Sequence, residues 1–278
     1  MAASPFTLVI FLIAIAAGLV GALTGLGGGI IVTPALTLML GVDMRYAIGA
    51  SLVSVIATSS GAASGYVRDG LTNIRIGMFL EIATTVGAIC GALLAAKTPT
   101  NALAILFGAV LLYSAWQVIR TKLEAGSLVT PDAFTRKLRL NGIYHAAEGE
   151  IPYQVTHTRM GFAMMYVAGL VSGLLGIGSG ALKVIAMDRV MRIPFKVSTA
   201  TSSFMIGVTG VASAAIYLKR GYIHPMIALP VMLGVLAGST VGARLLPRLP
   251  VRLLRRLFAI AVAIIAIQMI LHGLRGRG

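Results

Sequence analysis

The sequence predicts an all-α polytopic membrane protein made of two tandem repeats, and three observations support this prediction. Hydrophobic residues make up 58% of the 278 residues, and charged residues make up only 11%. A soluble domain carries about 25% charged residues, so this chain has too few to cover a surface that faces water. Long apolar segments follow one another along the chain. Two matching glycine-rich breaks interrupt them at a fixed spacing.

The two breaks have the sequences GLGGG at 25–29 and GIGSG at 176–180, an offset of 176 − 25 = 151 residues. The same offset, without a gap, aligns other residues: Gly18 with Gly169, Ser51 with Ser202, Gly87 with Gly238, Gly91 with Gly242, and Pro99 with Pro250. Chance does not keep glycines and prolines in register over such a distance. We therefore expect repeat 1 at 1–120, a polar cytoplasmic linker at 121–158 and repeat 2 at 159–278.

Each repeat contains four long apolar segments and one short segment that directly follows the break. In repeat 1 the segments are 6–25, 29–41, 47–66, 75–96 and 102–120; in repeat 2 they are 159–176, 180–191, 197–218, 224–246 and 252–272. A helix needs about 20 residues to cross a membrane, and the second segment of each repeat is shorter than this. Short, glycine-interrupted segments at matching positions of two halves indicate the central site of a transporter.

The basic residues predict how the two repeats are oriented. If each short segment crosses the membrane, every repeat has five passes and the repeats are inverted; if it re-enters, the repeats are parallel. Five passes place sixteen Lys and Arg inside and six outside, whereas four passes divide them twelve to ten. The positive-inside rule therefore favours inverted repeats with both termini outside, in a bacterial-type inner or plasma membrane.

The linker is the one sizeable polar stretch. Residues 140–146 and 150–157 have the pattern of two short strands around Glu148-Gly149-Glu150, which predicts a β-hairpin. The histidines and glutamates there match no metal-ligand spacing, so we expect neither a metal nor a cofactor. The net charge of +15 comes from residues between the apolar segments, which argues against a nucleic-acid partner.

The motifs around the breaks resemble those of the TauE/SafE family of membrane transporters, named for proposed sulfite and organosulfonate export. They are GLVGALTGLGGGIIVTPAL and GLVSGLLGIGSGALKVIAMD, followed by IGASLVSV and TATSSFMIGVTG. The resemblance covers nearly the whole chain and implies an α-helical secondary transporter for a small anion, often one that contains sulfur. Repeat 2 departs from a related subgroup pattern at Ser179, Ile185 and Ser203, where that pattern has Gly, Pro and Asn.

The breaks are candidate anion sites on physical grounds as well. A helix that starts inside the membrane presents unpaired backbone N–H groups and the positive end of its dipole. Glycine also lets an anion approach the backbone closely. The expected substrate-binding residues at the breaks are Gly27, Gly28, Gly29, Gly178, Ser179 and Gly180. The alternative is that these glycines only allow close helix packing, which is the interpretation we favour for Gly87, Gly91, Gly238 and Gly242.

Lys183 lies in the first turn of the second short segment, where repeat 1 has Val32 (32 + 151 = 183). An ionisable residue at membrane depth is rare and usually functional, so we expect Lys183 to attract the anion. The alternative is that its side chain extends to the membrane interface.

Hydroxyl groups follow each break. Ser51, Thr201, Ser202 and Ser203 could hydrogen-bond an anion, or equally bond back to helix backbone. Glu81 is the one acidic residue in the core of a repeat 1 helix, and two roles stay open for it. It is either a proton-coupling carboxylate or the partner of Arg75 or a neighbouring loop cation.

These features predict a secondary transporter of a small anion that works by alternating access. An anion channel with the same site is the alternative. An intramembrane enzyme would need a Ser–His pair, paired Asp residues or an HExxH motif at membrane depth. The four histidines, His145, His157, His224 and His272, are not placed for this, so we do not expect an enzyme. The sequence does not predict the oligomeric state.

Overall fold

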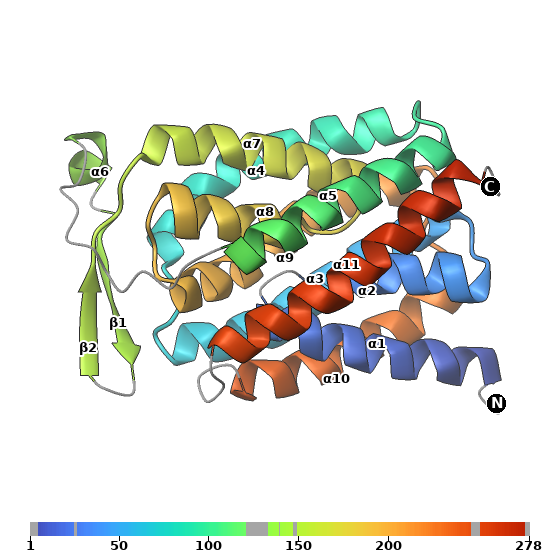
Figure 1. The fold of residues 1–278 in the computed structure, drawn as a ribbon, viewed down its shortest axis with the longest axis horizontal. Coiled ribbons are helices and arrows are strands. Elements are labelled where there is room, and N and C mark those ends of the chain that lie inside the picture. The colour runs from blue at the N-terminus through green and yellow to red at the C-terminus, as the bar shows by residue number, and fades with distance from the viewer. Residues whose placement is uncertain are drawn as a thin grey trace.

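The computed structural model describes residues 5–24, 27–120, 133–138, 140–146, 149–245 and 251–275. Its long helices run along the long axis of the molecule, and a small β-hairpin covers one end (Figure 1). The first half contains α1 (Pro5–Thr24), α2 (Gly29–Pro34), the π-helical turn η1 (Ala35–Met39), α3 (Met44–Arg68), α4 (Ile74–Ala95) and α5 (Thr100–Arg120). The second contains α7 (Thr158–Leu175), α8 (Gly180–Ile185), the π-helical turn η2 (Ala186–Val190), α9 (Phe195–Lys219), α10 (Pro225–Leu245) and α11 (Val251–Leu274).

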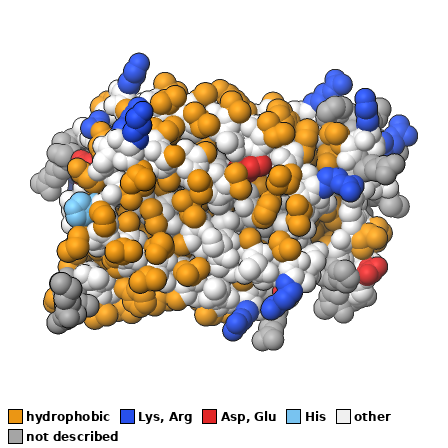
Figure 2. All heavy atoms as spheres, turned by 180° about the vertical axis from the view of Figure 1, so that it is seen from behind, with side chains coloured by type: hydrophobic (Ala, Val, Ile, Leu, Met, Phe, Trp, Pro, Cys, Tyr) orange, Lys and Arg blue, Asp and Glu red, His pale blue; other side chains and the backbone are white. Residues whose placement is uncertain are grey.

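The outer surface is apolar. Among the described residues, α1, α3, α4, α7, α9 and α10 are long and apolar enough to cross a membrane. Large hydrophobic side chains on these helices face outward, such as Leu12 (56% exposed), Ile82 (62%) and Val211 (55%). Figure 2 shows such side chains over the middle of one face, with Lys and Arg mainly toward its periphery. An apolar surface of this extent suits lipid, so the predicted all-α multi-pass membrane protein is confirmed.

The elements of the two halves have matching bounds. Residues 29–34 and 180–185 form α2 and α8, 35–39 and 186–190 form η1 and η2, and 44–68 and 195–219 form α3 and α9. The difference is 151 residues in each case (for example 44 + 151 = 195). The halves are also interlocked, because α1 packs on α10 and α7 packs on α4, at opposite edges of the bundle (Figure 1). The helices α3 and α9 pack together between these pairs.

Glycines let the interlocked helices approach until their backbones touch. A Cβ atom added to Gly169 or Gly173 of α7 would clash with the carbonyl oxygen of Thr84 or Ala88 of α4. The residue numbers rise together along this contact, so α4 and α7 run parallel. The contact between α1 and α10 is built in the same way, with Gly238 against the carbonyl of Ile15.

Two other helix pairs run antiparallel. A Cβ atom on Gly108 of α5 would lie 2.6 Å from the carbonyl oxygen of Ala266 of α11, and one on Gly273 of α11 would lie 2.9 Å from that of Asn101. In the centre, Ser59 of α3 donates a hydrogen bond to the carbonyl of Phe204 of α9, while Gly210 lies near the earlier residue Ile56. Helices at matching positions of the two halves, α3 with α9 and α5 with α11, therefore point in opposite directions.

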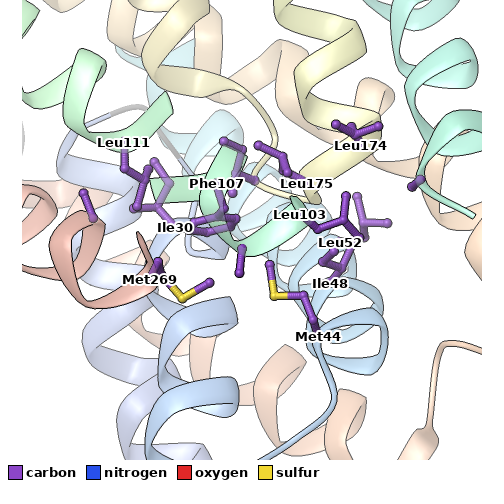
Figure 3. Packing of buried hydrophobic residues seen from close by; sticks show 14 of the residues in the cluster. Ile30, Met44, Ile48, Leu52, Leu103, Phe107, Leu111, Leu174, Leu175 and Met269 are labelled. Carbon is purple, nitrogen blue, oxygen red and sulfur yellow. The ribbon is translucent and has the colours of Figure 1, made fainter. Parts of the chain in front are cut away.

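The largest buried hydrophobic cluster of the described residues lies beside the short helix α2. It includes Ile30 of α2, Leu52 of α3, Phe107 of α5, Leu175 of α7 and Met269 of α11 (Figure 3). Because these five helices come from both halves, the cluster fixes the position of α2 and of the end of α7, where the second break begins.

The linker forms α6 (Ala133–Leu138), β1 (Gly142–Ala146) and β2 (Gly149–Tyr153), and the two strands pair antiparallel. The helix α6 is not expected from the sequence. The second strand ends at Tyr153 and does not reach His157, because the following chain turns to bond elsewhere: the Val155 N–H donates to Asn141 Oδ1 (3.0 Å) and the Thr156 N–H donates to the Met191 carbonyl (3.2 Å). The start of α1 and the end of α11 lie at the opposite end of the molecule (Figure 1).

Candidate functional site

The two glycine-rich breaks meet at the centre of the bundle, where α3 packs on α9. Gly27 (φ 78°) and Gly178 (φ 69°) both have left-handed backbone, which glycine adopts without strain. A Cβ atom on Gly27 would lie 3.1 Å from Ile206 and 3.3 Å from Val55, and one on Gly178 would lie 2.8 Å from Val55 and 3.5 Å from Ile206. The breaks therefore lie against the same pair of side chains, one from each half.

Ser51 connects the two breaks directly. Its hydroxyl donates a 2.7 Å hydrogen bond to the carbonyl oxygen of Gly176, the first residue of the second break. A Cβ atom on Gly29 would clash with the Ser51 hydroxyl and would lie 3.0 Å from the Gly176 oxygen. The structure thus brings the predicted residues Gly29 and Ser51 together, and the Ser51 hydroxyl bonds the backbone of the other half.

At the first break, a side chain of α3 pairs with one backbone N–H group at the start of the short helix. The Gly28 N–H donates a 3.1 Å hydrogen bond to the hydroxyl of Thr58 on α3. The Gly28 carbonyl accepts from the N–H groups of Ile31 and Val32, both at 3.1 Å. Thr58 is fully buried. This helix start carries no charge, because the position equivalent to Lys183 is Val32.

The second break differs from the first. Ser179 occupies the position of Gly28 (28 + 151 = 179) in a left-handed conformation, φ 48°, which is unusual for a residue with a side chain. Its hydroxyl is buried, and within the described part of the chain it has no hydrogen-bond partner. The counterpart of Thr58 is Thr209 (58 + 151 = 209), and its hydroxyl bonds charged side chains.

Those side chains are Lys183 and Glu81. Lys183 Nζ donates to Thr209 Oγ1 (2.5 Å), and Thr209 Oγ1 donates to Glu81 Oε1 (2.6 Å). Lys183 Nζ also lies 3.7 Å from Glu81 Oε2. Both charged side chains are buried, Lys183 completely. Burial of a charge is costly unless a partner of opposite charge is close, and each of these groups supplies that partner to the other.

The ion pair connects the two halves of the chain. Glu81 belongs to α4 of the first half, whereas Lys183 belongs to α8 and Thr209 to α9 of the second. Thr85, one turn after Glu81, donates a second hydroxyl bond to Glu81 Oε1 (3.1 Å). Glu81 Oε2 has no hydrogen bond in the described residues and faces Lys183 only as an ion pair.

The remaining predicted hydroxyls lie in different surroundings. Thr201 accepts a 3.0 Å bond from the Asn73 N–H at the start of α4, so it contacts a helix end near the hairpin and not a break. Ser202 donates to the carbonyl of Gly180, the first residue of α8, at 3.4 Å. The Ser203 hydroxyl is buried and has no hydrogen-bond partner within the described chain.

Sequence reasoning did not identify Thr209 and Thr85 as site residues, nor Lys183 as the partner of Glu81. The repeat offset offered a signal for Thr209, because it aligns Thr209 with Thr58 near the first break. No comparable signal exists for the ion pair, since the positions equivalent to Lys183 and Glu81 are Val32 and Met232 (81 + 151 = 232).

Comparison with known proteins agrees with the architecture. The family model of the sulfite exporter TauE/SafE matches residues 10–269. "Probable membrane transporter protein YunE" of Bacillus subtilis (strain 168) is 26% identical over 96% of this chain and 98% of its own. YdhB of the same organism, also named a probable membrane transporter protein, is 26% identical over 87% and 90%. A "Probable membrane transporter protein" of Xylella fastidiosa (strain Temecula1 / ATCC 700964) is 28% identical over 91% and 92%.

No solved structure matches the chain. The family match covers nearly all of the sequence, including both breaks, Lys183 and Glu81. These findings bear out the resemblance seen in the break motifs, and the chain belongs to the sulfite exporter TauE/SafE family of membrane transporters.

Proposed function

We propose that the protein is a secondary transporter that carries a small anion, a sulfur oxyanion or an organosulfonate, by alternating access. The observation that carries this proposal is Lys183, a fully buried cation on α8, a six-residue helix that starts inside the bundle. A buried cation at membrane depth is usually part of a substrate or ion pathway. The family name and the names of the relatives support transport, and the family name supports the sulfur-containing class.

We further propose that the two halves are repeats of inverted topology. The matching element bounds and the opposite directions of α3 and α9 support this proposal. The packing between the halves also supports it, because the first helix of each half packs against the fourth helix of the other. Inverted repeats are a common basis of alternating access, in which one repeat rocks against the other around a central site. The ion pair between Glu81 and Lys183 connects the two halves, so such a motion would change the distance between its two side chains.

The hairpin end is proposed to face the cytoplasm of a bacterial-type inner membrane, with both termini outside. Among the described side chains, the basic residues support this orientation, because those at the helix ends near the hairpin outnumber those at the opposite ends. Near the hairpin are Arg68, Arg75, Arg136, Lys137, Arg159, Arg189, Arg192, Lys196 and Arg244; opposite are Arg45, Lys97, Lys219, Arg220 and Arg275.

The proposed substrate site is centred on the second break. Lys183 supplies the charge, and the hydroxyls of Ser179 and Ser203, which have no hydrogen-bond partner among the described residues, supply hydrogen bonds. The backbone of both breaks and the hydroxyls of Ser51 and Ser202 complete the surroundings. Thr201 takes a supporting role through Asn73. Glu81 is proposed as the proton-coupling group of the same site.

Thermal unfolding of the purified protein with a panel of anions tests this function. The panel contains sulfite, sulfate, thiosulfate, taurine, methanesulfonate, sulfoacetate and simple carboxylates. A ligand that binds the folded state raises the unfolding temperature by mass action. We expect a sulfur-containing anion to do so, and the effect to persist in Lys97→Met, which removes an exposed lysine between α4 and α5. Absence of a shift with every anion would contradict the proposal.

Flux measurements separate the transporter from an anion channel. In liposomes that contain the protein, a transporter shows uptake that saturates with anion concentration and is accelerated by the same anion on the far side. Flux that rises linearly and shows no such exchange would favour the channel.

A further inference from the structure

We infer that the Glu81 carboxylate occupies the place of the transported anion beside Lys183, so that each monovalent anion must enter together with one proton. This inference rests on the proposed function, in which Glu81 is the proton-coupling group, and adds the stoichiometry of anion and proton. It follows from the charges and contacts around the ion pair.

The charge balance of the site is simple. Glu81 and Lys183 are the two charged side chains that are buried in the described part of the chain. On the helices packed against α4 and α8, the other charged residues among the described side chains are Arg75 on α4, Arg159 on α7, and Lys196 and Lys219 on α9, which lie at or near helix ends, and Asp188 and Arg189 on η2, which are half-buried. The side chains of the site therefore carry one negative and one positive charge, which sum to zero.

A monovalent anion would upset this balance if it arrived alone. The site would then hold two negative charges and one positive charge away from water, which is strongly unfavourable in a low-dielectric environment. A proton transferred from water to Glu81 restores neutrality. Lys183 then faces the incoming anion, and the site with its anion and proton has the same net charge as the ion pair alone.

The hydrogen bonds of Glu81 suit this exchange. Oε1 accepts from Thr85 at 3.1 Å and from Thr209 at 2.6 Å, so this oxygen holds the carboxyl group in place. Oε2 has no hydrogen bond in the described residues and faces Lys183 at 3.7 Å. A proton on Oε2 forms an O–H bond there and cancels the attraction to Lys183. Among the described residues, Thr209 is the one hydrogen-bond partner of the Lys183 ammonium group, and release of Glu81 frees further N–H groups to bind an anion.

The stoichiometry follows from the asymmetry of the two halves. At the positions equivalent to Lys183 and Glu81, the chain has Val32 and Met232 (32 + 151 = 183, 81 + 151 = 232). Thr85 is matched by Leu236 (85 + 151 = 236). The first break thus lacks both the cation and the carboxylate, and one anion with one proton is expected in each transport cycle.

The test measures methanesulfonate binding to the purified full chain together with proton uptake. Methanesulfonate is monovalent throughout the range of about pH 5 to 8, so only the protein titrates there. We expect one proton taken up per anion bound where Glu81 is ionised, and an affinity that weakens by about tenfold per pH unit in that range. In Glu81→Gln, binding should take up no proton and should not vary with pH. The control Glu150→Gln, an exposed hairpin residue, should behave as the wild type.

Each outcome decides the inference. Binding to the wild type without proton uptake, or proton uptake that persists in Glu81→Gln, would overturn it and leave the transporter assignment intact. The wild-type measurement stands by itself if Glu81→Gln does not fold. No methanesulfonate binding at any pH would also overturn the inference, and the anion panel then decides whether the proposed function fails with it.

Discussion

Lys183 Nζ and Glu81 Oε2 lie 3.7 Å apart inside the helix bundle, and they belong to different halves of the chain. Thr209 bonds both side chains through one hydroxyl group. Any motion that separates α4 from α8 and α9 must therefore break or replace this ion pair. An anion at Lys183 and a proton at Glu81 are the replacements that our proposal names.

Replacing one partner of the ion pair should destabilise the fold. We expect Lys183→Met to lower the free energy of unfolding by about 3–5 kcal/mol, because it leaves the Glu81 carboxylate buried without a cation. The double variant Lys183→Met/Glu81→Gln should recover most of this loss. Denaturant titration of all variants checks the prediction, and a single variant as stable as the wild type would refute the energetic role of the pair.

Thr58 should stabilise the first break through its bond to the Gly28 N–H. We expect Thr58→Val to cost about 1–3 kcal/mol of unfolding free energy, because a buried N–H loses its acceptor. Thr58→Ser keeps the hydroxyl and should retain most of the stability. Equal stability of Thr58→Val and Thr58→Ser would mean that the bond is not needed.

The parallel contact between α4 and α7 should not tolerate a single added methyl group at its glycines. A Cβ atom at Gly173 would clash with the Ala88 carbonyl, so Gly173→Ala should cost about 1–3 kcal/mol or more. At Gly65 of α3 the nearest atom is the Ala243 Cβ at 3.3 Å, a contact that a small shift can relieve. Gly65→Ala is the matched control, and comparable losses in the two variants would contradict the account of the contact.

The hairpin should be held to α4 by Tyr153, whose hydroxyl accepts a 2.7 Å bond from Asn73 Nδ2. Tyr153→Phe removes this bond and should cost about 0.5–1.5 kcal/mol. Burial raises the pKa of Tyr153 above its usual value of about 10, against a smaller opposite effect of the Asn73 bond.

The raised pKa also predicts a pH dependence. The unfolded chain releases the Tyr153 proton first, so stability is complete below about pH 10 and falls as the pH rises toward the folded-state pKa. The wild type should therefore lose stability above about pH 10 more steeply than Tyr153→Phe. Parallel alkaline slopes for the two proteins would show that Tyr153 is not the group responsible.

Much of the fold could be predicted from the sequence because hydrophobicity marks each membrane helix. The segment predicted at 47–66 is the helix Met44–Arg68, and the added residues reflect a helix cap, since Asp43 accepts a bond from the Arg45 N–H (2.9 Å). The Asn73 side chain caps α4 in the same way. Such caps are local, but they extend a helix beyond its apolar run, so the hydropathy pattern alone misplaces its ends.

The site could be predicted only in part. Gly27 and Gly178 could be predicted because a glycine-rich sequence interrupts an apolar helix, and Lys183 because it is a charged residue in an apolar segment. The contact of Lys183 with Glu81 depends instead on α7 packing against α4, which brings residues 102 positions apart together (183 − 81 = 102). No sequence pattern within either helix predicts that contact, so it is seen only in the structure.

Uptake of methanesulfonate into liposomes that contain the wild type or the double variant Lys183→Met/Glu81→Gln tests the central claim most directly. The double variant removes both charges of the buried ion pair. A loss of uptake therefore cannot be attributed to a buried charge that has lost its partner. Saturable uptake by the wild type and none by the folded double variant is the result that the account predicts. Equal uptake by both proteins would contradict the claim that Lys183 binds the transported anion.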